Sequence, residues 1–293
     1  MEIKAGDRKG YQGDDMIKTF EYLAPNGAKM SLLHNDYFNV IDITGLTSIN
    51  NDVAAVVVPQ MDGDVVNNVQ AQPRDVTIYL RLKQSAGIQR AQRYVMQYVK
   101  PKLTGTLHMV RDDLDIKLEG IVTAVDLPRF AQGCTMAITL YCSMPYWEDV
   151  SAVQAELSTI INLHHFPISF PAEGVPFGEY DNDLSQHLNN TGDVSTGMII
   201  TLIATGEVVN PKLTATDGQF IGITDTLQAN DEVVINTVKG QKSITKNGND
   251  ILNKIAEGSH FLQLQTGDNK FTISADEGVN NMYFTLEYKR LYI

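Results

Sequence analysis

The sequence predicts a mainly β protein with two domains. Its 293 residues are enough for two domains of ordinary size. Short alternating runs separated by turn residues fill the C-terminal half, and a single stretch in the N-terminal half has helical periodicity. We therefore expect an N-terminal β-sandwich-like domain with one α-helix over residues 1–147. An antiparallel β-sandwich is expected over residues 148–293.

The C-terminal half consists of candidate strands joined by tight turns. The strands are Thr201–Ile203, Lys212–Thr216, Phe220–Thr224, Glu232–Asn236, Lys242–Lys246, Phe261–Gln263, Lys270–Ser274 and Tyr283–Leu291. The turns are Asp217-Gly218, Lys239-Gly240, Asn247-Gly248 and Gly267-Asp268-Asn269. Asn-Gly and Asp-Gly pairs readily supply the positive φ angles that hairpin turns need. Strands at intervals of about 8–12 residues favour a sandwich.

The N-terminal half begins with a segment, residues 1–27, that is expected to hold a short strand and a mobile arm. The candidate strands are Phe20–Leu23 and Lys29–Leu33 around Pro25-Asn26-Gly27, then Tyr37–Thr44, Asp75–Leu82, Thr104–Arg111, Asp115–Asp126 and Cys134–Cys142. The apolar run Ala54–Pro59 leads into a turn that ends at Asp62-Gly63.

The predicted helix covers Gln84–Lys100. Ile88, Ala91, Val95 and Val99 recur at helical spacing, Ser85 is a candidate N-cap, and Pro101 ends the helix. Tyr94 and Tyr98 flank this stripe. They are candidates for a binding face, although packing against a sheet is the favoured interpretation.

Composition and charge exclude several classes. The chain is 43% hydrophobic and 20% charged, which is typical of globular proteins. No apolar run approaches the roughly 20 residues that a membrane span needs, and the N-terminus lacks a signal-peptide core. A net charge of −12 argues against specific nucleic-acid binding. A local basic face is the remaining alternative, and its candidate residues are Arg81, Lys83, Arg90, Arg93, Lys100 and Lys102.

Cys134 and Cys142 are predicted to be reduced. If they lie at the two ends of one strand, their Cα atoms are roughly 26 Å apart at about 3.3 Å per residue. A disulfide needs a Cα separation below about 7 Å.

The sequence contains no recognisable catalytic, cofactor-binding or metal-binding motif. Known nucleophile and zinc-protease motifs are absent, and the segment 239–243 lacks the glycine spacing of a phosphate loop. His164 and His165 would point to opposite faces of a strand, so they do not form a zinc site. Asp112, Asp113 and Asp115 form one acidic group, and Asp181 and Asp183 form another. For both groups a solvated turn is preferred to a calcium site.

The stretch between the two halves gives the least information. Residues 141–147 gather Tyr141, Tyr146 and Trp147 around Pro145, which suggests a packed corner where the chain changes domain. Sugar stacking by Trp147 is the alternative. Residues 150–193 contain Phe-Pro passages at 166–171 and 175–178, and a turn at 189–193.

An ordered series of short matches in the C-terminal half carries a family resemblance. The series is Asn210-Pro211-Lys212, residues 231–236, Lys246-Asn247-Gly248, residues 258–261, Leu264, Gly267-Asp268-Asn269 and residues 288–292. It resembles the distal tail protein family of long-tailed bacteriophages, also called the siphophage tail component family. The resemblance covers most of the chain and is better in the second half.

The resemblance implies a galectin-like C-terminal sandwich and a structural role rather than an enzyme. It implies a hexameric hub ring in the virion tail tip, assembled in the host cytoplasm. The expected partners are further copies of the chain, the tail tube protein, the tail-associated baseplate protein and a receptor-binding protein. DNA would pass through the ring, and no membrane is involved. The expected interface residues are Ile88, Arg90, Arg93, Tyr94 and Tyr98. A lectin-like carbohydrate-binding protein is the alternative function.

Overall fold

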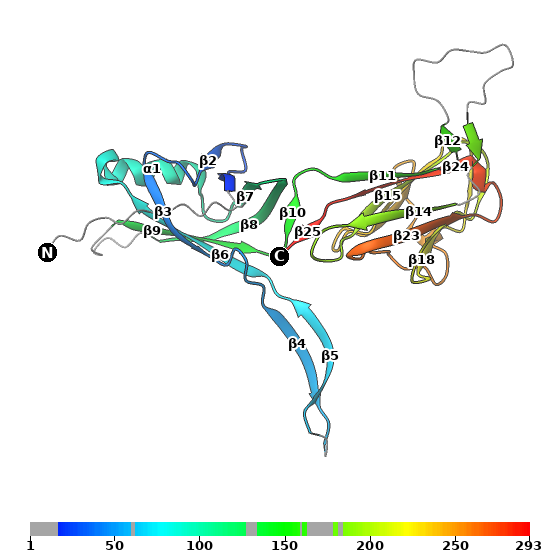
Figure 1. Cartoon of the computed structure of the whole chain (residues 1–293), viewed down its shortest axis with the longest axis horizontal. Coiled ribbons are helices and arrows are strands. Elements are labelled where there is room, and N and C mark those ends of the chain that lie inside the picture. The colour runs from blue at the N-terminus through cyan, green and yellow to red at the C-terminus, as the bar shows by residue number, and fades with distance from the viewer. Residues whose placement is uncertain (1–16, 60–61, 127–133, 159, 163–177, 181–183) are drawn as a thin grey trace, which may run out of the picture. The chain divides into compact units, whose positions relative to one another are not determined.

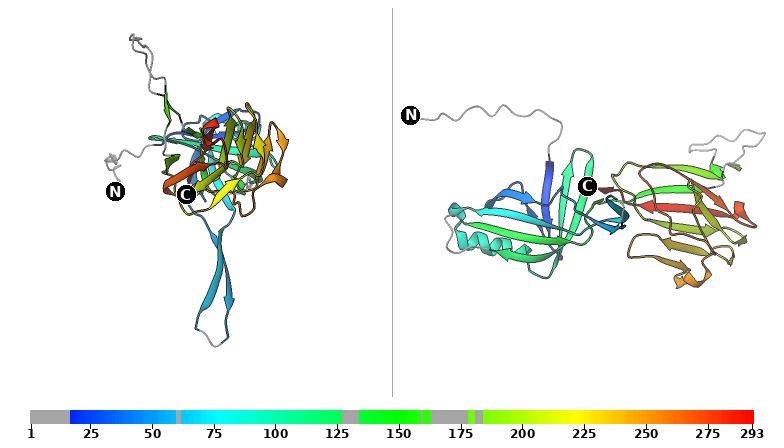
Figure 2. Two further views of the ribbon diagram at one scale, coloured as in Figure 1. Left: turned by 90° about the vertical axis from the view of Figure 1, so that its right-hand side faces the viewer. Right: turned by 90° about the horizontal axis from the view of Figure 1, so that it is seen from below.

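The computed structural model describes residues 17–59, 62–126, 134–158, 160–162, 178–180 and 184–293. The chain divides into two compact units. Unit 1 comprises residues 1–150 with Ile293, and unit 2 comprises residues 151–292. Both are built mainly from antiparallel strands (Figures 1 and 2), so the predicted fold class is confirmed.

Unit 1 is built on one continuous antiparallel sheet with the strand order β2-β1-β7-β8-β9-β6-β3, and β10 pairs with β8. Its strands are β1 (Ile17–Leu23), β2 (Lys29–Ser31), β3 (Phe38–Thr44), β6 (Arg74–Leu82), β7 (Thr104–Arg111), β8 (Leu114–Asp126), β9 (Thr135–Cys142) and β10 (Trp147–Asp149). The strand β6, between β9 and β3, alternates buried and more exposed residues, as expected for a sheet with one covered face.

The helix α1 (Ile88–Tyr98) follows a short 3₁₀ turn, η1 (Gln84–Ala86). Ala91, Val95 and Val99 are fully buried, so the predicted helical stripe packs into the core. The prediction that Ser85 caps the helix is wrong. The residue before the helix is Gly87, whose φ of 80° suits glycine, and no side chain caps the first turn. The helix therefore begins after the glycine, and Ser85 belongs to the 3₁₀ turn.

A separate two-stranded hairpin leaves unit 1 between β3 and β6. It is formed by β4 (Asn51–Val57) and β5 (Asp64–Ala71), which pair only with each other among the described residues. The hairpin extends away from the sheet (Figures 1 and 2). The sequence predicted the apolar run in β4 but not the strand β5.

Unit 2 contains a larger sheet of order β11-β24-β15-β20-β21-β22 and a smaller one of order β14-β23-β17-β18. The larger sheet consists of β11 (Val153–Ser158), β15 (Met198–Ala204), β20 (Glu232–Asn236), β21 (Ser243–Lys246), β22 (Asn249–Asp250) and β24 (Met282–Tyr288). The smaller sheet consists of β14 (Ser185–Asn190), β17 (Lys212–Ala215), β18 (Phe220–Gly222) and β23 (Gly267–Ser274). The remaining elements are β12 (Ile160–Asn162), β13 (Gly178–Tyr180), β16 (Val208–Val209), β19 (Thr226–Leu227), β25 (Leu291–Tyr292), η2 (Leu252–Lys254) and η3 (Val279–Asn281).

Both sheets of unit 2 contribute to one hydrophobic core. Ile200 and Leu202 on β15 belong to the same buried cluster as Leu213 on β17 and Phe271 on β23. This shared core makes unit 2 a sandwich, because alternate residues of each sheet point inward. The predicted turn residues also take their expected conformations, with positive φ at Gly218, Gly240, Asn247 and Gly248.

Two predictions in unit 2 are wrong. Phe261–Gln263 is not a strand, and the ladder contact nearby is an isolated bridge between Leu264 and Thr196. The predicted turn Gly267-Asp268-Asn269 is instead the start of β23, because these residues pair with β14.

Several predictions fall outside the described residues. These are the N-terminal arm before residue 17, His164 and His165, the Phe-Pro passages, and the acidic pair Asp181 and Asp183. Within the described part, Cys134 and Cys142 are free thiols. No helix there has the length and apolar character needed to span a membrane.

Candidate interface site

Among the described residues of unit 1, exposed valines gather on the β4–β5 hairpin. Val53 pairs with Val69, and Val56 pairs with Val65. These four side chains are 40–57% exposed, and Val57 is 73% exposed. An isolated hairpin is marginally stable in water, and unpaired strand edges invite pairing with another chain. The hairpin is therefore a candidate contact surface.

The two faces of the hairpin differ. Val53, Ala55 and Val57 lie on one face of β4, because side chains alternate along a strand. The residues opposite them on β5 are Val69, Val66 and Asp64. On the other face the Val56–Val65 pair is accompanied by Asp52 opposite Gln70 and Ala54 opposite Asn68. The first face is thus the more apolar, and we call it the valine face.

The root of the hairpin is held by a buried arginine. The Arg74 guanidinium donates a hydrogen bond from Nη1 to the Leu46 carbonyl oxygen at 2.8 Å, and Arg74 is 5% exposed. The Trp147 indole N–H donates to the same oxygen at 3.1 Å. Gly45 has φ 83°, and a Cβ there would collide with the Asp75 carbonyl oxygen. The chain therefore enters and leaves the hairpin through a close-packed junction. The same geometry buries Trp147, which is 2% exposed, so its ring is not available to stack on a sugar.

The five predicted interface residues all lie on α1, where they form two groups. Tyr94 stacks on Tyr37 with ring centroids 4.2 Å apart, and Tyr98 lies 5.1 Å from Tyr94. Burial, followed by its hydrogen bond with Tyr98, raises the pKa of Tyr94. These tyrosines are half-buried and mainly pack against the fold.

The second group lines a surface cleft at the start of the helix. A cleft of about 670 Å³ is lined by residues 84–90 and by Arg93. Its lining therefore includes Ile88, Arg90 and Arg93. Ile88 is half-buried, whereas both arginines are exposed. The structure therefore brings these three residues together, but an interface role for any of the five remains a prediction.

Among the described residues, two histidines contact carboxylates. His108 Nε2 lies 2.6 Å from Asp115 Oδ1, and His187 Nδ1 lies 2.8 Å from Asp268 Oδ2. The His187 contact is a single pair, whereas His108 Nδ1 also lies 3.8 Å from Glu21 Oε2. Within the described residues no group of three or more His, Cys, Asp or Glu could hold a metal ion. Asp112 has φ 51° in the turn between β7 and β8.

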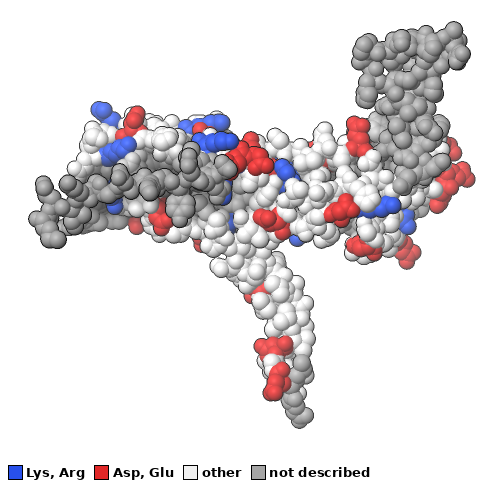
Figure 3. All heavy atoms as spheres, viewed as in Figure 1, with Lys and Arg blue, Asp and Glu red and all other residues white. Residues whose placement is uncertain are grey.

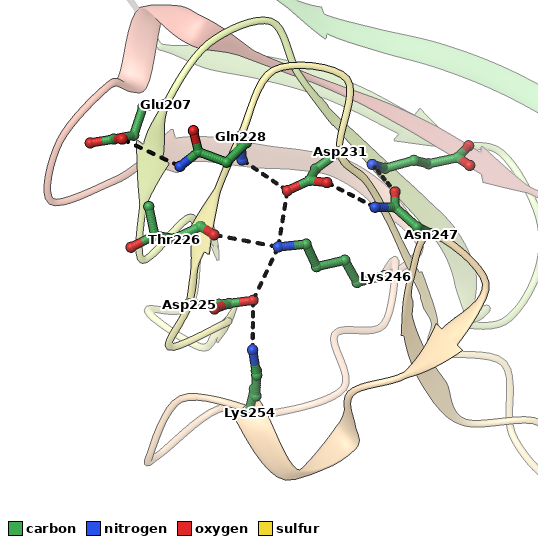
Figure 4. A network of polar contacts seen from close by, with 9 residues as sticks. Glu207, Asp225, Thr226, Gln228, Asp231, Lys246, Asn247 and Lys254 are labelled. Carbon is green, nitrogen blue, oxygen red and sulfur yellow. Dashed lines mark hydrogen bonds and ion pairs between the residues drawn. The ribbon is translucent and has the colours of Figure 1, made fainter.

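A polar network in unit 2 organises the loops beside β20 and β21 (Figure 4). Lys246 Nζ lies 2.9 Å from Asp231 and 3.3 Å from Asp225, and Lys254 Nζ lies 2.9 Å from Asp225. Asp231 also accepts hydrogen bonds from the Gln228 backbone N–H and from the Asn247 amide, both at 2.8 Å.

These contacts perturb the titration of the network. The Gln228 backbone N–H, then Asn247 and Lys246, lower the pKa of Asp231 to about 2. Burial opposes ionisation of Asp225, but its contacts with Lys254 and Lys246 outweigh this effect and lower its pKa. The carboxylates of Asp225 and Asp231 are paired with lysines of the same chain, so the geometry of the network fits a structural role.

Comparisons with known proteins give a family match for part of unit 2. Residues 191–292 match the family model described as "Siphovirus-type tail component, C-terminal domain". Unit 2 contains a siphovirus-type tail component domain. The predicted resemblance is thereby confirmed for this part of the chain, which includes the Lys246 network. No curated protein sequence matches the chain.

Solved structures resemble the fold of this chain well beyond the tail component domain. The structure of SPP1 Dit (gp 19.1) is similar with a TM-score of 0.64 at 14% identity, covering 94% of this chain and 100% of that one. It is described as a paradigm of the hub adsorption apparatus in phages that infect Gram-positive bacteria. A chain of the phage P2 baseplate, solved in its activated conformation with Ca, has a TM-score of 0.45 at 10% identity. That match covers 93% of this chain and 98% of the other.

Proposed function

We propose that this protein is a structural subunit of a phage or prophage tail tip. Six copies form a hub ring that joins the tail tube to the tail-associated and host-binding proteins. The ring is assembled in the host cytoplasm and DNA passes through it. The protein acts by shape-complementary assembly and has no catalytic step.

The observation that carries this proposal is the match of residues 191–292 to the tail component domain. The likeness of the fold to SPP1 Dit, which spans 94% of the chain, supports the same role for unit 1 and unit 2 together.

The hairpin of unit 1 supports self-assembly in particular. Exposed apolar side chains on a projecting hairpin are typical of a surface that another chain covers. A second copy of the chain is the occupant that a ring requires. The exposed residues of α1, Arg90 and Arg93, form the other part of the proposed interface.

Native mass spectrometry and negative-stain imaging of the purified full chain test the proposal. The expected result is one closed oligomer of six copies with an open centre, whose population increases with protein concentration. A chain that remains monomeric at every concentration, or that forms a dimer with no ring, would refute the proposed hub.

A further inference from the structure

The hairpin of unit 1 carries charge of only one sign. Residues 45–73 contain Asp52, Asp62 and Asp64 and no Lys or Arg. Asp62 and Asp64 lie toward the far end of the hairpin, where Figure 3 shows acidic and no basic side chains. The hairpin therefore presents a valine face that ends in carboxylates.

The segment around α1 carries the opposite charge. Residues 76–111 contain no Asp or Glu, although the whole chain has a net charge of −12. Basic side chains gather over the part of unit 1 that holds α1 (Figure 3). Arg90 and Arg93 both line the cleft of about 670 Å³. Within the part of the chain that the structure describes, neither forms an ion pair.

The backbone donors at the start of α1 lie in the cleft without a side-chain cap. Among the described residues no side chain forms a capping hydrogen bond to α1, and the first turn has no acidic residue. The first backbone N–H groups of a helix need an acceptor from outside the helix, and they favour a negative charge. The cleft thus combines two unpaired guanidinium groups with uncapped N–H groups, which together suit a carboxylate.

We propose that Asp62 and Asp64 of one copy dock in the α1 cleft of a neighbouring copy. This inference rests on the proposed ring and specifies its contact. Within unit 1 the hairpin leaves the sheet away from α1 (Figure 1), so the carboxylates do not serve the cleft of their own chain.

The two surfaces fit ring formation for a geometric reason. The hairpin end and the cleft are different parts of the chain, so their contact is head-to-tail. Head-to-tail contacts generate a closed ring when the rotation between copies closes. Each copy then donates one hairpin and receives another. Carboxylates can also accept two parallel hydrogen bonds from a guanidinium, which fixes orientation as well as charge.

Charge reversal of each surface tests the contact. One variant carries Arg90→Glu and Arg93→Glu, so its cleft and its hairpin end are both acidic. The other carries Asp62→Arg and Asp64→Arg, so both surfaces are basic. Each variant alone is expected to assemble at least tenfold more weakly than the unmodified chain in native mass spectrometry. Higher salt is expected to weaken the contact of the unmodified chain, because salt screens exposed charges.

An equimolar mixture of the two variants is the decisive sample. The acidic hairpin of the first fits the basic cleft of the second, and the basic hairpin of the second fits the acidic cleft of the first. Mixing is therefore expected to restore rings that contain equal numbers of both variants. A control with Arg81→Glu and Lys100→Glu changes the charge equally at exposed sites outside the cleft and should assemble normally. Circular dichroism verifies that every variant is folded.

The outcomes separate the two proposals. Variants that assemble like the unmodified chain, or a mixture without recovery, would overturn the docking contact while the ring stands. If the cleft variant assembles normally but loses binding to a DNA duplex, the cleft is a phosphate site and the docking contact is wrong. An unmodified chain that remains monomeric overturns the ring and the contact together.

Discussion

Substitution of the valine face should weaken assembly without unfolding the subunit. The informative variant is Val53→Thr with Val69→Thr, which alters one cross-strand pair of that face. Threonine keeps the branched shape and the strand propensity of valine, so the hairpin itself should persist. The change replaces one methyl group by a hydroxyl group at each position.

The exposure of the two side chains sets the expected magnitude. Loss of a buried methyl group costs about 0.8 kcal/mol, and burial of an unpaired hydroxyl costs about 1 kcal/mol more. Val53 is 52% exposed and Val69 is 57% exposed, so about half of each surface is available to a partner. The expected loss is about 1 kcal/mol per position and about 2 kcal/mol for the pair, or roughly a 30-fold weaker association.

A matched pair on the opposite face provides the control. Val56→Thr with Val65→Thr makes the same chemical change in side chains that are 51% and 40% exposed. Sedimentation velocity across a concentration series measures the association of each variant. The valine-face pair should shift the midpoint about 30-fold and the control pair less than about threefold, which is under about 0.7 kcal/mol. Equal effects of the two pairs, or no effect of either, would refute the assignment of the valine face to the contact.

Three further predictions concern the subunit itself. Because the pKa of Asp231 is lowered to about 2, its ionised form stabilises unit 2 above about pH 4 and that contribution disappears as the pH falls toward 2. Asp231→Asn should therefore cost about 2 kcal/mol at pH 7 in urea denaturation and almost nothing near pH 2; a cost that is independent of pH would contradict this account. Gly105→Ala should destabilise unit 1 by about 1–3 kcal/mol, because the new Cβ collides with the Tyr22 ring, and an unchanged melting temperature would argue against that contact. Burial raises the pKa of the Cys142 thiol to about 11. Iodoacetamide at pH 8 should therefore label the partly exposed Cys134 in the folded chain and Cys142 only after unfolding. Equally fast labelling of both thiols would show that Cys142 is accessible.

The sequence predicted strands well where turn chemistry marks their ends. The Asn247-Gly248 turn joins β21 to β22, and its positive φ values are those that glycine and asparagine tolerate. The helix boundary was less certain, because Ser85 and Gly87 are both common before a helix and only the backbone conformation distinguishes them. The strand predicted at Phe261–Gln263 failed for another reason. Its residues satisfy strand propensity, but no neighbouring strand forms a ladder with them.

The candidate site was predictable in part. The periodicity of the apolar residues predicted the helix that carries the arginines and the tyrosines. The sequence could not show that Tyr94 stacks on Tyr37 while Arg90 remains exposed. The root of the hairpin was not predictable, because Leu46, Arg74 and Trp147 are distant in sequence and meet only in the folded sheet. The charge asymmetry was present in the sequence, where the acid-free segment 76–111 follows the base-free segment 45–73.

The hairpin escaped prediction because the usual rule for apolar runs refers to burial within one chain. A continuous run such as Ala54–Val58 normally indicates a strand covered on both faces. Here the run is exposed on both faces, while the chain buries Arg74 at the root, where the guanidinium Nε and Nη2 have no hydrogen-bond partner among the described residues. Leaving such donors unpaired costs about 1–3 kcal/mol, and exposed valines contribute no stability to the subunit. The exposed valines are understandable if the structure that must be stable is the assembly, in which a neighbouring copy covers the valine face. The burial rule then holds for that face, but it applies to the ring rather than to the single chain.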